Sequence, residues 1–318
     1  MSIRTWTAAL IFTVALSSCH GHRDSASSTS DPMRSDDEVN HPKENENEAS
    51  DGRSERRALN ARDTFVIKRL YFSRENSGKS VGFDLDDRES DSADDQGCYA
   101  SDFEDPTFGP GVDNQFALLL PLIEAAGGEA VEPYAQTAVN QGRMLLFFEI
   151  LNSAAGTAHD VTVRLYRALG DTIVGTDGFL LPWQTFDIDI ESAWFDAKGQ
   201  RRDGILTVEN FEFTLPIYIF DFYFEARLLG GKLRIEWGEH GRHTGVIAGA
   251  VTLNNILEIA DAVEGGSEEA ALIHSLGSSY ADLLPDENGA CQALSVTLQF
   301  ETTGAFLYED SPRFPDAP

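Results

Sequence analysis

The pattern of apolar and polar positions divides the chain into an N-terminal part without periodicity and a longer part with it. From residue 64 onward there are short runs rich in β-branched and aromatic residues, and most of them alternate with a period of two. Such alternation is typical of strands that bury one face and expose the other, as in antiparallel sheets. The predicted strands are Thr64–Phe72, Val81–Leu85, Met144–Leu151, Asp160–Arg167, Gly204–Leu215, Phe220–Leu228, Leu233–Trp237, Gly245–Val251 and Ala293–Phe300.

Glycine and asparagine positions predict how these strands connect. The segment Asn76–Ser80 separates the first two strands and has the composition of a hairpin turn. Gly230-Gly231 separates two alternating runs and predicts a two-residue turn between them. The alternation slips at Glu209-Asn210, which predicts a β-bulge. In the final strand, four side chains are expected to face the core: Leu294, Val296, Leu298 and Phe300.

Apolar residues with helical spacing predict two pairs of helices. The first helix begins at Asp113 or Asn114, whose side chain is expected to cap it, and runs to about Ala126. Pro121 lies within it and predicts a kink or an early break. The other predicted helices are Ala130–Asn140, Leu253–Val263 and Ser267–Leu284. The element order predicts an α+β fold with a mainly antiparallel sheet, a sandwich or partial barrel, and two helix pairs.

The N-terminal part lacks the residues that a core needs. From His20 to Arg62 there is no aromatic residue, and Ser, Asp, Glu, Asn and Arg predominate. Such a segment cannot bury enough apolar surface to offset the entropy of ordering it. We therefore predict a disordered tether over residues 19–62, with a mean reach of about 35 Å. One globular domain is predicted over residues 63–311, followed by a frayed C-terminus over 312–318.

The first residues predict export. Arg4 is followed by the apolar run Ala8–Leu16, which is too short to span a bilayer, so residues 1–18 are typical of a signal peptide. The sequence Leu16-Ser17-Ser18-Cys19 resembles the lipobox of bacterial lipoproteins. This resemblance implies that Cys19 becomes an acylated N-terminus that anchors the protein in a membrane. Because His20, and not Asp, follows the cysteine, it also implies the outer membrane. The alternative is an ordinary signal peptide cut nearby, with Cys19 a spare thiol.

Charge narrows the classes of partner. With 53 acidic and 24 basic residues, the chain has a formal net charge of -29. Nucleic acid is disfavoured, because phosphate binding needs clustered Lys and Arg. Adsorption to anionic lipid headgroups is disfavoured for the same reason. A divalent cation, a basic protein or an apolar ligand remains compatible with this composition. In the simplest alternative, the acidity only keeps an exported protein soluble.

Three cysteines occur in the chain, and the lipobox uses one of them. The remaining two, Cys98 and Cys291, would meet an oxidising compartment after export. We therefore predict a disulfide between them, which would pin the acidic segment described next against the final strand. The alternative is that they are two unrelated thiols.

The acidic segment Val81–Gln115 is the strongest candidate for a functional site. Its carboxylates are crowded, and hard cations such as calcium bind six to eight oxygens from carboxylates, amides and carbonyls. The segment departs from the EF-hand pattern, because it lacks the glycine and glutamate that this pattern requires. We predict six candidate calcium ligands: Asp84, Asp86, Asp91, Asp94, Asp95 and Asp113. The alternative is a solvated acidic loop.

No catalytic signature accompanies these acids, because the chain contains neither G-x-S-x-G, nor H-E-x-x-H, nor a dinucleotide-binding fingerprint. Three short stretches, the GFDLD at 82–86, Gly97-Cys98 and Gly111–Gln115, resemble predicted lipoproteins of myxobacteria, a group without an assigned activity. The resemblance implies a location and no mechanism. We therefore predict an outer-membrane lipoprotein that is a non-enzymatic binding or structural module. The alternatives are a carrier of hydrophobic ligands, which requires an internal cavity, and a hydrolase with a carboxylate site.

Overall fold

The computed structural model describes residues 62–95, 98–125, 131–151, 158–192, 194–219, 222–264 and 276–308. All of these residues belong to one compact unit, Glu48–Pro318. The predicted signal peptide, Cys19, nearly all of the tether and the predicted frayed C-terminus lie outside the described residues.

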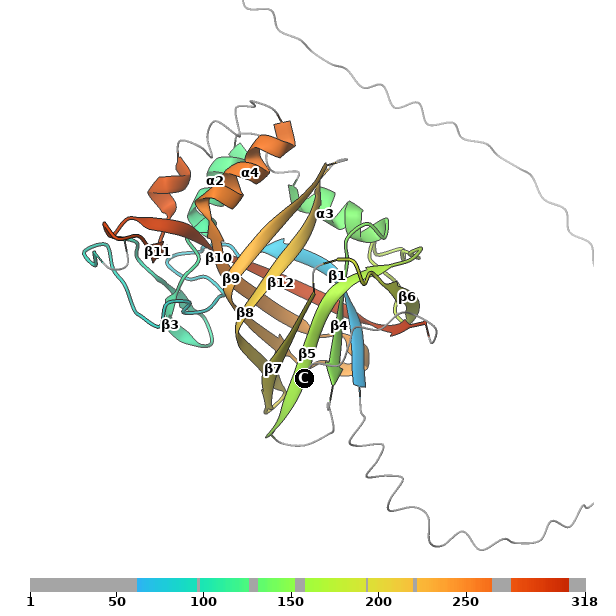
Figure 1. The fold of residues 1–318 in the computed structure, drawn as a ribbon. Helices are drawn as coiled ribbons and strands as arrows, with labels where there is room; N and C mark the ends of the chain where they lie inside the picture. Colours follow the sequence, from blue (N-terminus) through green and yellow to red (C-terminus); the bar gives the residue numbers. More distant parts are fainter. Residues whose placement is uncertain are drawn as a thin grey trace, which may run out of the picture. The chain divides into compact units, whose positions relative to one another are not determined.

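Eight strands form a closed antiparallel barrel (Figure 1). Each barrel strand pairs with the next one along the chain, and the last strand pairs with the first, so that no barrel strand is left at a sheet edge. The barrel strands are β1 (Arg62–Phe72), β4 (Leu145–Leu151), β5 (Ala158–Leu169), β7 (Trp194–Arg202), β8 (Ile205–Ile219), β9 (Phe222–Glu236), β10 (Thr244–Thr252) and β12 (Cys291–Leu307).

The remaining elements lie between the barrel strands. They are β2 (Phe103–Asp105), β3 (Gly109–Val112), α2 (Phe116–Ala125), α3 (Val131–Asn140), β6 (Gln184–Ile188), the short 3₁₀ helix η2 (Glu239–Gly241), α4 (Leu253–Glu264) and β11 (Leu283–Pro285). The predicted α+β class with a mainly antiparallel sheet is confirmed, and the barrel is closed. The helices α2, α3 and α4 lie where the spacing of apolar residues predicted them.

Large apolar side chains fill the inside of the barrel. The rings of Phe65, Phe148 and Phe300 lie on three neighbouring strands, with centroids 5.2 and 5.5 Å apart. On the other side, Phe195 of β7 stacks on Phe211 of β8 at 4.5 Å. In β12, the four residues predicted to face inward are all buried. This packing follows from the period-two pattern, because the wet faces of the strands point outward.

The predicted turn at Gly230-Gly231 is wrong. Both residues lie inside β9, which runs unbroken from Phe222 to Glu236, and the pairing with β8 shifts its register there. Gly230 has φ 58, and a Cβ on Gly231 would lie 2.6 Å from the ring of Phe211. The two glycines therefore form a bulge that makes room for an aromatic ring. The predicted bulge at Glu209-Asn210 is confirmed, with a register shift between Val208 and Phe211.

Two further predictions are wrong at the level of single elements. Val81–Leu85 is not a strand of the sheet, since it makes only an isolated bridge between Phe83 and Asp113. The predicted helix Ser267–Leu284 does not reach its predicted end, because β11 begins at Leu283 and pairs with β12. Residues 265–275 of that helix lie outside the described part of the chain. A tight turn is present at Asn76–Ser80, where Asn76 and Lys79 exchange two main-chain hydrogen bonds, but it does not join two strands of the sheet as predicted.

The described part of the connection between β1 and α2, residues 73–95 and 98–115, lies against the outer face of β9, β10 and β12. We call them the cover segment, and it includes the hairpin of β2 and β3. Its contacts are with outward-facing residues, such as Arg234 of β9 and Thr297 of β12. The acidic segment of the sequence is therefore an ordered layer on the barrel wall.

Candidate functional site

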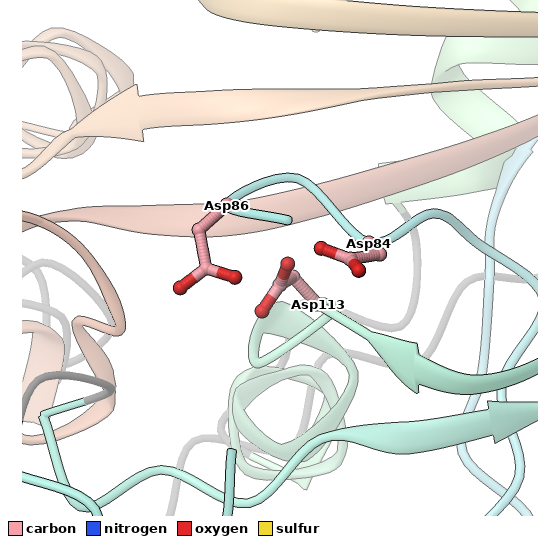
Figure 2. Close-up of side chains that lie close together, drawn as sticks. All are labelled: Asp84, Asp86 and Asp113. Carbon is pink, nitrogen blue, oxygen red and sulfur yellow. The ribbon is translucent and has the colours of Figure 1, made fainter. Parts of the chain in front are cut away.

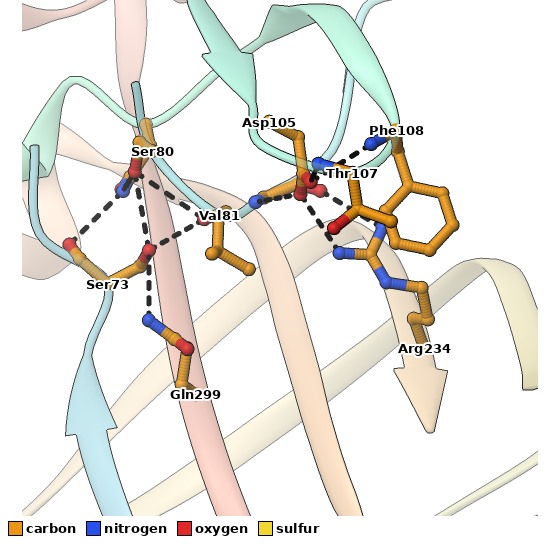
Figure 3. Close-up of polar contacts among 10 residues, drawn as sticks. Ser73, Ser80, Val81, Asp105, Thr107, Phe108, Arg234 and Gln299 are labelled. Atoms are coloured by element: carbon orange, nitrogen blue, oxygen red, sulfur yellow. Dashed lines mark hydrogen bonds and ion pairs between the residues drawn. The ribbon is translucent and has the colours of Figure 1, made fainter. Parts of the chain in front are cut away.

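An ion pair between the barrel and the cover segment holds one end of the segment in place. The guanidinium of Arg234 donates to Asp105 Oδ2 at 3.0 Å, and both residues are buried. Its charged carbon lies 3.7 Å from the ring centroid of Phe108 (Figure 3). It also lies 5.0 Å from the ring centroid of Phe83. The N–H groups of Gly82, Thr107 and Phe108 also donate to Asp105. Although burial opposes ionisation, these donors and the guanidinium hold the pKa of Asp105 below its usual value.

The fully buried Asn114 joins three parts of the structure. Its amide nitrogen donates to Ser80 Oγ at 2.8 Å and to the main-chain oxygen of Ser73, and its amide oxygen accepts the N–H of Thr297 on β12. Figure 3 shows the neighbouring bonds of Ser73, with Val81 and with Gln299. The sequence predicted that Asp113 or Asn114 caps α2. In the structure, the side chain of Asn114 bonds Ser73, Ser80 and β12, and Asp113 accepts the N–H of Leu85, so neither side chain caps this helix.

The predicted disulfide joins Cys98 and Cys291, with their Cα atoms 6.1 Å apart. Cys98 lies in the cover segment, and Cys291 is the first residue of β12. The bond therefore fixes the acidic part of the cover segment to the barrel wall, 193 positions away in the sequence.

Three carboxylates converge beside this disulfide-linked part of the cover segment. Asp84, Asp86 and Asp113 each offer an oxygen, and these oxygens all lie within 4.8 Å of one another. Figure 2 shows the three side chains pointing toward one another, two from the loop after Gly82 and one from the end of β3. Gly111 allows this course of the chain, because its φ of 88 lies in the left-handed region, and a Cβ there would lie 3.3 Å from the main-chain oxygen of Arg88.

Two more acids border the cluster. Asp102 lies nearby in the cover segment, and its carboxyl group shares a hydrogen bond with that of Asp113. Asp282 lies just before β11, is 4% exposed, and accepts bonds from the N–H and hydroxyl of Ser295. The hydroxyl of Ser295 in turn accepts the N–H of Gln115. We call Asp84, Asp86, Asp102, Asp113 and Asp282 the carboxylate cluster.

Burial makes the charged form of this cluster costly. Burial raises the pKa of Asp113 to about 9, and the negative charges of Asp282, Asp102 and Asp86 raise it further. The N–H of Leu85, which donates to Asp113 at 2.6 Å, lowers this pKa but does not offset the increase. Burial also raises the pKa of Asp282 to about 7. It raises the pKa of Asp86 and of Asp102 as well. A carboxyl group in such a site either holds a proton or needs a cation.

No basic side chain among the described residues forms an ion pair with the carboxylate cluster. The ammonium of Lys232 donates to the main-chain oxygen of Asp84 at 2.6 Å, but its ion pair is with the exposed Asp87. The guanidinium of Arg88 pairs with Asp94, although its charge also acts on Asp86. Asp86 Oδ1 is buried and has no hydrogen-bond partner. The carboxylate cluster therefore lacks a direct ion pair such as Arg234 makes with Asp105, and the charge of Arg88 does not prevent the pKa of Asp86 from being raised.

The other predicted ligands do not join this cluster. Asp91 Oδ1 accepts the N–H of Ala93 in a local turn, Asp94 pairs with Arg88 at 3.1 Å, and Asp95 is exposed. Sequence reasoning also missed Asp102 and Asp282 as neighbours of Asp113. The sequence contained a weak signal for Asp282, because it is an acid beside an apolar run near the second cysteine.

The geometry bears on the two alternative functions. A hydrolase needs acids that a substrate can reach, but Asp113 and Asp282 are each only 4% exposed. A carrier needs an internal cavity, and the barrel interior holds the stacked phenylalanine rings described above. A groove of about 510 Å³ lies on the wall near β7, β8 and β9, where Trp194, Glu212 and Arg227 contribute to its lining. This groove is open and largely polar, so it is not a cavity for an apolar ligand.

Within the described part of the chain, we find no helix with the length and apolar composition needed to cross a membrane. Comparison with known proteins finds no matching family model, no matching curated protein and no matching solved structure.

Proposed function

We propose that the chain is an outer-membrane-anchored lipoprotein whose barrel carries a calcium site formed by Asp84, Asp86 and Asp113. The protein acts as a binding or structural module and not as an enzyme. The observation that carries this proposal is the convergence of three carboxylates within 4.8 Å around a buried acid, without a basic partner. The export and anchoring part is supported by the lipobox resemblance at Cys19 and by the long polar segment that follows it.

Calcium fits this donor set better than other partners do. It binds carboxylate and carbonyl oxygens in flexible geometry, whereas magnesium demands a small octahedral site and retains its water. Asp84, Asp86 and Asp113 would supply the charged oxygens, and Asp102 lies within hydrogen-bonding distance of Asp113 as a further donor. A basic protein would need access to the acids, and burial of Asp113 excludes that. A divalent ion bound there would neutralise the repulsion that raises the pKa values of the cluster.

A titration calorimeter tests the site directly. Calcium added to the metal-free protein is expected to bind one site, to release protons at neutral pH, and to raise the melting temperature. Proton release follows from the raised pKa of Asp113, because the bound cation displaces the proton that the apo site holds. The number of protons is obtained from heats measured in buffers of different ionisation enthalpy.

Matched variants locate the site. Asp113→Asn is expected to abolish both the calcium heat and the thermal shift, because it removes the central oxygen charge. Asp91→Asn and Asp95→Asn remove acids of the same segment that lie outside the cluster, and they are expected to leave the titration unchanged. Absence of calcium heat in the parent protein, or a loss that is equal in all three variants, would refute the site.

A further inference from the structure

A second surface feature lies away from the carboxylate cluster, where β6 meets the C-terminal end of β12 (Figure 1). Five large apolar side chains there are between 43 and 62% exposed: Ile173, Leu181, Trp183, Phe306 and Tyr308. We call this set the apolar patch. Between residues 172 and 183 the only charged residue is Asp177. Single exposed apolar residues are normal on a protein surface, whereas a group of this size marks an interaction site.

Backbone contacts bring the two segments that carry the patch together. The N–H of Leu181 donates to the oxygen of Ile173, and the N–H of Trp183 donates to the oxygen of Gly304 at 2.6 Å. The N–H of Tyr308 donates to Phe186 of β6. The rings of Trp183 and Phe306 are 5.3 Å apart. The loop before β6 and the end of β12 therefore present their apolar side chains from one small region.

The patch is held rigidly, at some cost in backbone strain. Trp183 has φ 66, a left-handed conformation that bulky residues rarely adopt. Its ring lies over Gly304, where a Cβ would be 2.6 Å from the nearest ring atom. The Gln184 amide bonds both main-chain groups of Ile173 and the oxygen of Leu181. Strain maintained to hold a half-exposed tryptophan in place points to a functional role for that side chain.

The patch lies beside the point where the described chain begins. Thr64, near the start of β1, donates from its hydroxyl to the main-chain oxygen of Ala305 at 2.7 Å. Ala305 lies between the two β12 residues that contact Trp183. The residues upstream of β1 include the polar segment and Cys19, which lies 43 positions before Arg62. A chain anchored through Cys19 would thus leave the barrel next to the apolar patch.

We propose that the apolar patch docks the barrel on the surface of a lipid bilayer with neutral headgroups. Indole, phenol and aliphatic side chains are the groups that partition into the bilayer interface. Self-association is disfavoured, because a second copy carries the same net charge of -29. A basic protein partner would seek charged groups, which the patch lacks. If the proposed anchor holds the chain, it raises the effective concentration of membrane around the patch, so that a weak affinity suffices.

The test uses the mature chain from Cys19 to Pro318 with Cys19→Ser, which cannot be acylated, so the result does not depend on the anchor. We expect this protein to sediment with phosphatidylcholine vesicles, and brominated phosphatidylcholine is expected to quench its tryptophan fluorescence. Replacing Ile173→Ser together with Leu181→Ser is expected to lower the partition coefficient about tenfold or more. The control is Tyr99→Ser, which removes a side chain that is 65% exposed outside the patch and should change nothing.

Three results would overturn the proposal. The first is no association of the parent protein with these vesicles, and the second is equal association of the double variant. The third is a concentration-dependent dimer, seen by analytical ultracentrifugation and lost in the double variant, which would make the patch an interface between copies. Circular dichroism checks that the variants fold. The calcium titration of the same proteins reports separately on the carboxylate cluster, so failure of one proposal is distinct from failure of the other.

Discussion

The cover segment contains two buried acids whose hydrogen-bond donors and neighbouring charges differ. Asp105 and Asp113 are both almost fully buried against the barrel wall. Asp105 has the guanidinium of Arg234 and three N–H donors, and its pKa is lowered. Asp113 has one N–H donor and other acids around it, and burial raises its pKa to about 9. The same degree of burial therefore gives a closed ion pair at one place and an uncompensated acid at the other, and only the second has a reason to bind a cation.

The largest expected effect is that of removing the disulfide. Replacing both Cys98→Ser and Cys291→Ser is expected to lower the free energy of unfolding by about 5 kcal/mol, because the bond closes a loop of 193 positions. Urea denaturation measures this loss. Calcium affinity is expected to fall as well, since Asp102 and the cluster lose their fixed position beside β12. An unchanged calcium affinity would show that the cluster is organised without the bond.

The second largest expected effect is that of breaking the ion pair between Arg234 and Asp105. Arg234→Met keeps much of the apolar contact with the phenylalanine rings but leaves Asp105 buried without its cation, which is expected to cost about 3–5 kcal/mol in urea denaturation. Lys79→Met is the control, because its ion pair with Glu104 is about half exposed on both sides and contributes under about 1 kcal/mol. Similar costs for the two variants would contradict the role given to burial.

Asp113→Asn is expected to have the opposite sign. In the metal-free protein near neutral pH, folding requires Asp113 to take up a proton, and this proton uptake costs free energy. The neutral amide of asparagine avoids that cost. We expect stabilisation by about 1–3 kcal/mol in urea denaturation. Excess calcium, which at a hundred times its dissociation constant adds about 2.7 kcal/mol to the parent protein, is expected to add nothing to the variant. Destabilisation of the metal-free protein by Asp113→Asn would show that Asp113 is a structural anion like Asp105.

The smallest expected effect is the change in the free energy of unfolding of the metal-free protein for each pH unit. Folded Asp113 holds its proton up to about pH 9, whereas the unfolded acid releases it near 3.8, so between these values the folded state binds more protons. The free energy of unfolding contributed by this group therefore falls as pH rises through that window, by at most about 1.4 kcal/mol per pH unit. Thermal melts in a chelator measure the slope, and Asp113→Asn is expected to reduce it. A contribution that rises with pH across this window would exclude the raised pKa.

The sequence predicted the barrel strands that are rich in apolar residues and missed the most polar one. Strand β12 alternates and was predicted, as were β4 and β10, which are apolar on both faces. Strand β7, with the sequence WFDAKGQRR, does not read as a strand, because Asp196 looks exposed until Arg164 is found to donate to both of its carboxylate oxygens at 2.7 Å. A pair of glycines such as Gly230-Gly231 is common both in turns and in bulges. Here it forms a bulge, because the ring of Phe211 packs against Gly231, and that contact cannot be predicted from the local sequence.

The sequence predicted that the candidate site consists of aspartates, but it did not predict which aspartates meet. Spacing treats Asp91 and Asp95 as equal to Asp84, because all three occur in one acidic run. The structure separates them, since the β2–β3 hairpin and Gly111 return the chain so that Asp113 meets Asp84. Asp282 enters the cluster through its bonds with Ser295, 13 positions later. Contacts of this kind depend on the strand register, and no local pattern contains that information.

The pairing of β1 with β12 has a consequence for how the protein folds. Thr64 and Ala305, which bond at this seam, are 241 positions apart, so the wall stays open until nearly the whole chain is available. Contacts with such separation slow folding and leave intermediates exposed to aggregation. Because synthesis proceeds from the N-terminus, the strand that completes the wall is also among the last to be made. Truncation before residue 291 would therefore leave the first seven barrel strands without closure. It would also remove Cys291 of the disulfide and the β12 residues that the cover segment contacts.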